Sequence, residues 1–219
     1  MKMLKKTLVA VLFATTMPLL VHGSTYDDLI QGARLGDANA IGRLLARGAS
    51  ADTTDIEGNT LLMLAARDGH AQLAELLVNH RAKLNARNAA GDTALALAAL
   101  RGHQRIVEIL VAAGASQEVP GWPPLVYAAF GGHSEIVAFL LRHGANVDAV
   151  SESGMSALMA AARGGFRPIV NALLAAKANT ELRTDRGESA LDIALRFNNT
   201  DIAEQLRAVS AQQATKPAQ

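Results

Sequence analysis

Three histidines occupy equivalent places along the chain. His70, His103 and His133 each follow a glycine, at steps of 33 and 30 residues. Histidine serves as a zinc ligand and as a general base, so the series raises the question of a metal site or a catalytic site. Zinc needs ligands that converge at about 2 Å, whereas residues one repeat apart are expected roughly 10 Å from each other. The regular spacing therefore indicates structural turn histidines, and we expect no metal ligands.

Other signatures of catalysis are missing from the sequence. The chain has no cysteine to act as a nucleophile. It contains no G-x-S-x-G elbow, no H-E-x-x-H pair and no phosphate-binding loop. The Asp and Glu residues fall mainly in turns, where they cap and solvate the backbone. We therefore expect no catalytic residues, no cofactor and no enzymatic activity.

Arginines recur at one place in the repeat and could recognise a partner. Arg34, Arg67, Arg163 and Arg196 share a position, Arg101 lies one residue further along, and Leu100 and Phe130 fill the column between them. A basic stripe around an apolar centre would suit an acidic protein surface. The alternative is a set of solvated helix ends, because a cation near the C-terminus of a helix interacts favourably with the helix dipole.

The only tryptophan, Trp122, lies where the repeat spacing shortens, between Val119 and Pro124. Proline makes such a turn stiff. A rigidly held tryptophan at the rim of a binding face is a favoured anchor for a partner. The alternative is that Trp122 folds back to cover the gap that the shorter turn leaves. Together, the candidate partner-binding residues are Arg67, Leu100, Arg101, Trp122, Phe130, Met155 and Arg163.

The elements that position these residues follow from a sequence repeat. Gly58, Gly91, Gly121, Gly154 and Gly187 open similar segments at steps of 33, 30, 33 and 33 residues. A fixed period of this size marks a solenoid, in which each unit buries its apolar face against its neighbours. Half of the residues are apolar, so the chain can form a substantial core.

One unit shows how the chain should fold. Gly58 lies in a turn, Thr60 can cap the helix that follows, and Gly69 ends that helix. Leu73, Leu76 and Leu77 are spaced i, i+3 and i+4 and predict a second helix. Each unit is therefore expected to contain a turn, a helix, a tight turn, a second helix and a loop.

The N-terminus has the features of a secretory signal. Lys2, Lys5 and Lys6 precede an uncharged, mostly apolar run over residues 7–21, and small or branched residues lead up to Ser24. This pattern predicts a signal peptide over residues 1–23 and a periplasmic or secreted protein. The alternative is an uncleaved membrane anchor, although the run is short for a spanning helix and contains proline.

Charge and composition bound the kinds of partner. The chain has 21 basic and 20 acidic residues, and removal of residues 1–23 takes away three lysines and changes the net charge from +1 to −2. A nearly neutral chain with 4% aromatic residues gives no general case for binding nucleic acid or, after signal cleavage, a membrane. The absence of cysteine means that stability must come from packing.

The repeat resembles the ankyrin repeat. The resemblance is carried by Gly58-Asn59-Thr60 and its counterparts, by Gly69-His70, Gly102-His103 and Gly132-His133, and by Gly48-Ala49, Gly114-Ala115 and Gly144-Ala145. Two departures are notable. The histidine of the family's T-P-L-H motif is replaced by Met63, Ala96, Val126, Met159 and Asp192, which should shift stability onto apolar packing. Arg81 and Lys177 replace the glycine after the second helix, where a left-handed backbone would cost roughly 1 kcal/mol.

The resemblance implies an all-α ankyrin solenoid of about six units, with caps at both ends and a concave face of turn tips and first helices. The expected units are residues 25–57, 58–90, 91–120, 121–153, 154–186 and 187–209, followed by a disordered tail over 210–219. The implied function is non-catalytic binding of another protein, such as an exported enzyme or a toxin, by a monomer in the periplasm. The alternative is an envelope-tethered structural protein held by an uncleaved N-terminal segment.

Overall fold

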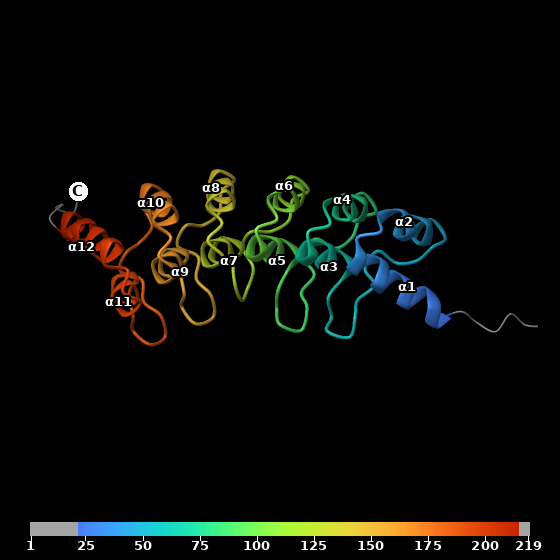
Figure 1. Cartoon of the computed structure of the whole chain (residues 1–219), viewed down its shortest axis with the longest axis horizontal. Helices are drawn as coiled ribbons and strands as arrows, with labels where there is room; N and C mark the ends of the chain where they lie inside the picture. Colours follow the sequence, from blue (N-terminus) through green and yellow to red (C-terminus); the bar gives the residue numbers. More distant parts are fainter. Residues whose placement is uncertain (1–21, 215–219) are drawn as a thin grey trace, which may run out of the picture.

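The chain forms one stack of helix pairs. A computed structural model describes residues 22–214, which contain twelve α-helices in six consecutive pairs (Figure 1). The first helices are α1 (His22–Leu35), α3 (Leu61–Asp68), α5 (Ala94–Arg101), α7 (Pro124–Phe130), α9 (Ala157–Gly164) and α11 (Ala190–Arg196). The second helices are α2 (Ala38–Ala46), α4 (Ala71–Asn79), α6 (Gln104–Ala112), α8 (Ser134–Arg142), α10 (Arg167–Ala175) and α12 (Thr200–Ala214). The predicted all-α solenoid is confirmed, and two isolated β-bridges, Thr54–Thr60 and Val150–Ser156, accompany the helices of this part of the chain.

The two helices of each pair lie in separate layers. First helices pack against first helices of the neighbouring pairs, and α2, α4, α6, α8 and α10 form the second layer (Figure 1). The loops that enter the first helices project from the stack on one side, and the loop before α7 projects less far than its neighbours (Figure 1). The proposed signal segment, residues 1–23, lies almost entirely outside the described residues. Within residues 22–214, no helix is both long and apolar enough to cross a membrane.

Side-chain caps start most of the first helices. The Thr60 hydroxyl accepts the Met63 N–H at 3.2 Å, as predicted, and Thr93, Ser156 and Ser189 cap α5, α9 and α11 in the same way. Helix α7 has no such cap. It begins with Pro124, which has no backbone N–H to satisfy, so a proline can start the helix without a capping side chain.

Some of the residues that replace the family histidine make polar contacts of their own. The Met63 and Met159 sulfur atoms accept the N–H groups of Thr60 and Ser156 at 3.4 and 3.5 Å. The Asp192 carboxylate accepts the Ser189 N–H at 2.9 Å. The expected shift of stability onto apolar packing is therefore only partial, because three loops satisfy this backbone donor through another side chain.

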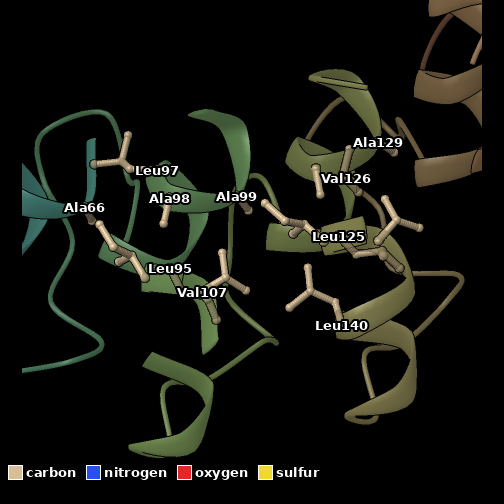
Figure 2. Close-up of a cluster of buried hydrophobic side chains, with 14 of the residues drawn as sticks. Ala66, Leu95, Leu97, Ala98, Ala99, Val107, Leu125, Val126, Ala129 and Leu140 are labelled. Carbon is tan, nitrogen blue, oxygen red and sulfur yellow. The ribbon is translucent and has the colours of Figure 1, made fainter. Parts of the chain in front are cut away.

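Small and branched residues fill the core between units. Figure 2 shows Val107 of the third unit on the side of Leu125 and Leu140 of the fourth, whereas Leu95 lies on the side of Ala66 of the second unit. All four of these larger side chains are at most 2% exposed. Alanine on the first helices allows adjacent units to approach closely, so each unit buries its apolar face against the next one.

The three equivalent histidines join consecutive units. The Nε2 atoms of His70, His103 and His133 lie 2.9, 3.1 and 3.0 Å from the carbonyl oxygens of residues 34, 67 and 100 in the preceding unit. A carbonyl oxygen can only accept, so each Nε2 must carry the proton and donate it. The interpretation of these residues as structural turn histidines is confirmed by this geometry.

Two non-glycine residues adopt the predicted left-handed backbone. Arg81 has φ of 60° and Lys177 has φ of 63°, and Gly48, Gly114 and Gly144 have positive φ at the same place in their units. The residue at this position after the second helix thus has the same left-handed backbone in all five units, whether it is glycine, arginine or lysine. The strain inferred from the sequence at Arg81 and Lys177 is therefore present.

Replacing Lys177 by glycine should stabilise the fold. The substitution relieves a left-handed conformation that disfavours a Cβ atom, so we expect the free energy of unfolding to rise by about 1 kcal/mol. Gly144→Lys is the matched control, because a Cβ at Gly144 meets no atom within 4 Å and only the backbone preference changes. It should lower the free energy of unfolding by a similar amount. Urea denaturation followed by circular dichroism measures both, and an unchanged Lys177→Gly variant would contradict the expectation.

The C-terminal helix is longer than predicted. We expected a disordered tail from residue 210, but α12 continues to Ala214. Ile202 and Leu206 are buried in the core, α12 packs against α11, and the Ser210 hydroxyl lies 3.3 Å from Thr180 Oγ1 of the preceding unit. The composition of residues 210–214 also suits a helix, because alanine and glutamine are good helix formers. The tail prediction was wrong for 210–214, and residues 215–219 lie outside the described part.

Candidate functional site

The short turn before α7 holds Trp122 against its own unit. The Trp122 ring stacks on Tyr127 at a centroid distance of 5.2 Å and an interplanar angle of 21°. Its edge contact with Phe130 has a centroid distance of 5.8 Å and an angle of 82°. Trp122 is half-buried. It therefore does both things that the sequence left open: it packs back onto α7, and it still lines an open groove.

The preceding unit supports this aromatic stack. The Tyr127 hydroxyl donates a hydrogen bond of 2.7 Å to Asp92 Oδ1 in the turn before α5. Burial raises the pKa of Tyr127 well above its ordinary value, and the bond to the Asp92 carboxylate raises it further. Tyr127 thus stays a neutral donor over the whole physiological range. The ring under Trp122 is fixed from two sides, so the tryptophan has little freedom to move.

Arg163 lies between two phenylalanines. Its guanidinium carbon is 5.2 Å from the ring centroid of Phe130 and also 5.2 Å from that of Phe197. Phe130 and Phe197 are 39% and 41% exposed, so both present apolar surface beside the arginine. Cation–π contact on both sides holds the arginine at the surface and keeps its charge accessible.

A groove runs from Trp122 to the turn before α11. It has a volume of about 670 Å³. Its lining consists of Trp122, Ser153, Met155, Arg163, Thr184, Asp185, Arg186, Glu188, Arg196 and Phe197. These residues come from three successive turns and from the ends of α9 and α11, so three units have to stack before the groove exists.

A second, smaller hollow adjoins Arg163. It has a volume of about 180 Å³ and is lined by Phe130, Ala160, Arg163, Gly164, Phe166 and Phe197. The three phenylalanine rings make it apolar. The two hollows share Arg163 and Phe197, so a cation and an apolar surface are available to one ligand at the same place.

The structure brings together only some of the predicted residues. Trp122, Phe130, Met155 and Arg163 cluster around the groove and the hollow. Arg67, at the end of α3, instead donates to the adjacent Asp68 at 2.9 Å. Leu100 and Arg101 end α5 and line neither hollow. Leu100 is half-buried and Arg101 is exposed.

Several residues of the site were missed in the candidate set. Tyr127 supports Trp122, and Phe197 covers Arg163 as well as Arg196, whose guanidinium carbon is 5.0 Å from the Phe197 ring centroid. Glu188 forms an ion pair of 2.6 Å with Arg196. Phe197 follows Arg196 in the arginine column, so the repeat register contained a signal for it. Tyr127 had no comparable signal, since it lies inside a helix that the pattern predicts to be apolar.

In the part of the chain that the structure describes, no three His, Asp or Glu side chains are grouped so that they could hold a metal ion. The histidine rings of the column donate to backbone carbonyls, as described above. The groove offers aromatic rings and guanidinium groups, which recognise ligands by contact and charge.

These features define a class: a helical repeat protein that presents a contact surface built from successive turns. Comparison with protein families identifies the class more closely. The model described as ankyrin repeats in three copies matches residues 29–120 and again residues 125–216. The chain therefore belongs to the ankyrin repeat family. Ankyrin repeats generally mediate protein–protein interaction, and the family is typically a non-catalytic scaffold.

Solved structures agree with this assignment. The chain is similar to the crystal structure of an ankyrin repeat domain from Acinetobacter baumannii AYE, with a TM-score of 0.74 and 29% sequence identity. The similarity covers 83% of this chain and 97% of that domain. A comparison with curated proteins gave no match.

Proposed function

We propose that this protein is a non-catalytic binding protein of the bacterial periplasm that holds another protein on the concave face around Trp122. The observation that carries the proposal is the groove of about 670 Å³ across three units, whose lining combines Trp122 and Met155 with three arginines. Exposed aromatic side chains in fixed positions and unburied arginines are the residue types that dominate protein interfaces.

The location rests on the N-terminal sequence. Three lysines followed by the apolar run over residues 7–21 are typical of an export signal. A partner would then be a protein that is itself exported, such as an enzyme that needs protection or a toxin that needs neutralising. The nearly neutral mature chain and the absence of cysteine suit a monomer that folds by packing alone.

Partner capture tests the function. A crosslinking pull-down from envelope extract should recover a stoichiometric protein with the wild type. Trp122→Ala should lose it, because removal of a central aromatic anchor costs about 2 kcal/mol or more, roughly a 30-fold weaker complex. Arg101→Ala is the matched control, since Arg101 is exposed outside the groove and its loss should leave capture unchanged.

The outcomes separate the site from the function. If Trp122→Ala and wild type capture the same protein equally, the binding face lies elsewhere on the stack. If neither variant captures a protein, the binding function is wrong. In that case an envelope-tethered structural role, which predicts an uncleaved N-terminus in the membrane fraction, becomes the better account. Mass measurement of the protein from cells decides cleavage, because removal of residues 1–23 leaves a chain that begins at Ser24.

A further inference from the structure

The members of the arginine column differ in one respect. Arg34 lies 3.5 Å from the Asp55 carboxylate, Arg67 lies 2.9 Å from Asp68, and Arg196 lies 2.6 Å from Glu188. Arg163 has the two phenylalanine contacts, but among residues 22–214 its guanidinium forms no ion pair and no hydrogen bond. A guanidinium carries five N–H donors arranged to match a carboxylate. Arg163 is therefore the column member whose donors remain available.

The repeat register explains why Arg163 lacks a partner. Thr184 occupies the position in its turn that Asp55 occupies in an earlier one, at the same offset that separates Arg163 from Arg34. Both side chains close the turn in the same way: Asp55 Oδ1 accepts the Asn59 N–H at 2.9 Å, and Thr184 Oγ1 accepts the Glu188 N–H at 3.3 Å. Threonine keeps the turn but supplies no carboxylate. The anionic partner that Arg34 finds within the chain is thus missing beside Arg163.

The charges around the groove favour an anionic ligand. Arg163, Arg186 and Arg196 share the lining of the groove with Asp185 and Glu188. Glu188 is already neutralised by Arg196, with which it forms the ion pair of 2.6 Å. Arg163 and Arg186 are then opposed only by Asp185, which is exposed. The groove therefore carries an excess of positive charge at the end where Phe130 and Phe197 are also uncovered.

We propose that Arg163 is a carboxylate receptor, and that the occupant of the groove is an extended acidic segment of the partner protein. In this segment a Glu or Asp side chain pairs with Arg163, in the place that Asp55 holds beside Arg34. A neighbouring large apolar side chain enters the hollow of about 180 Å³ between Phe130, Phe166 and Phe197. This role rests on the protein-binding function proposed above and adds the chemistry of the partner.

An extended segment fits the shape of the site better than a single terminal residue. The groove reaches over three successive turns, from Trp122 to Thr184 and Arg186. A chain end would use only the part near Arg163 and would leave the Trp122 and Met155 end uncovered. A continuous strand places one side chain in the apolar hollow, a carboxylate on Arg163 and further contacts along Met155 and Trp122.

Peptide binding to the full chain tests the receptor directly. Because Trp122 is the only tryptophan and lines the groove, its fluorescence reports occupancy without a label. The probes are acetylated and amidated octapeptides with a central Leu-Glu or Phe-Glu pair, and the same peptides with Gln in place of Glu. We expect the Glu peptides to bind about tenfold more tightly than the Gln peptides, and the preference to weaken as salt is raised.

Two substitutions should abolish the preference by different routes. Arg163→Gln removes the receptor. Thr184→Asp supplies the missing carboxylate from within the chain, so the carboxylate of the peptide has to compete with it for Arg163. Both variants should therefore bind the Glu and Gln peptides with equal affinity. Thr184→Asn keeps the turn without a charge and should retain the preference. Ser153→Asp adds the same charge elsewhere on the groove lining and should retain the preference for Glu peptides. It therefore distinguishes occupation of Arg163 from a general loss of positive charge in the groove.

An independent measurement checks the pairing inside the chain. Thr184→Asp should raise the midpoint of thermal unfolding in the wild-type background and should not do so in the Arg163→Gln background. The same stabilisation in both backgrounds would mean that residue 184 does not reach Arg163, and would overturn the proposed pairing. All variants should keep the helical circular dichroism of the wild type, because residues 163 and 184 lie at the surface or are half-buried.

The remaining outcomes are decisive. Equal binding of Glu and Gln peptides, or no binding of either up to millimolar concentration, would overturn the receptor. A preference for a Leu-Gln peptide with a free C-terminal carboxylate over the internal Leu-Glu peptide would also overturn it, since the ligand would then be a chain end. If wild type and Arg163→Gln capture the same partner equally from envelope extract, the receptor is wrong and the binding function stands. If no partner is captured at all, the binding function itself fails.

Discussion

Gly102→Ala should lower the free energy of unfolding by about 2–4 kcal/mol. Gly102 has φ of 79°, a left-handed backbone that a Cβ atom disfavours. An added Cβ would also lie 2.5 Å from the His133 ring, which is too close for any real contact. The ring cannot move away freely, because its Nε2 is bonded at 3.0 Å to the Leu100 carbonyl of the preceding unit. The backbone penalty and the loss of this inter-unit bond therefore add.

A matched glycine separates these two costs. Gly114 also has positive φ, at 88°, but a Cβ there meets no atom within 4 Å. Gly114→Ala should therefore cost only the backbone term of about 1 kcal/mol. His133→Ala in the Gly102→Ala background removes the clash. The stability losses of the single variants Gly102→Ala and His133→Ala should therefore add up to more than the loss of the double variant, by about 1 kcal/mol or more. Urea denaturation of the four variants provides the comparison, and equal losses for Gly102→Ala and Gly114→Ala would show that the ring contact contributes nothing.

Asp55→Ala should lower the free energy of unfolding by about 3 kcal/mol at neutral pH. The Asp55 side chain is only 2% exposed and lies 3.5 Å from Arg34. Its Oδ1 accepts the N–H groups of Glu57 and Asn59 at 3.0 and 2.9 Å, and its Oδ2 accepts from the Asn59 amide at 3.1 Å. The alanine variant leaves the two backbone N–H groups without this acceptor in a closed turn, whereas the Asn59 amide keeps its bond of 3.1 Å to Glu57. Asn59 also accepts from Asn88 in the next turn at 2.8 Å, so the damage should extend to the neighbouring unit.

The effect of Asp55 should depend on pH. Burial alone would raise the pKa of Asp55, but hydrogen bonds from Asn59 and Glu57, together with Arg34, outweigh it and lower the pKa below its ordinary value. A carboxylate with a lowered folded-state pKa contributes its ionic stabilisation above the unfolded value of about 3.9 and loses it as the pH falls through the lower folded value. The gap between wild type and Asp55→Ala should therefore be full at pH 7 and smaller at pH 3.

Denaturation at the two pH values measures this gap. Asp68 and Asp192 also have lowered pKa values, because hydrogen bonds from Arg67 and Ser189, respectively, favour their charged forms. They are common to both proteins, so their contribution cancels in the difference. Asp55→Asn is the control, since it keeps one oxygen acceptor and removes the charge, and its loss should be smaller than that of alanine. A gap that is the same at pH 7 and pH 3 would show that ionisation of Asp55 adds nothing to stability.

Much of the architecture was already determined by the sequence. The glycine period predicted the number and order of the helix pairs, Thr60 was expected to cap α3, and the left-handed backbone at Arg81 and Lys177 was inferred from their register. These predictions were confirmed because the features are local and are repeated. A residue that occupies the same place in several units is surrounded by the same backbone in each of them.

The tertiary structure decided what the repeat register could not. The extent of α12 depends on burial of Ile202 and Leu206 and on contacts of Ser210 with the preceding unit, which its polar composition does not reveal. The place of Trp122 depends on Tyr127 and Asp92, residues that come together only when the shortened turn is stacked on its neighbour.

The arginine column shows the division most clearly. The sequence by itself determined that four arginines share one position, because position in a repeat is a property of the chain. Only the stacked structure showed that Arg34 is paired with Asp55 while Arg163 is left between Phe130 and Phe197. The physical reason is that an arginine's partner comes from another turn or from the next unit, so it is chosen by the side chains that packing brings within a few ångströms.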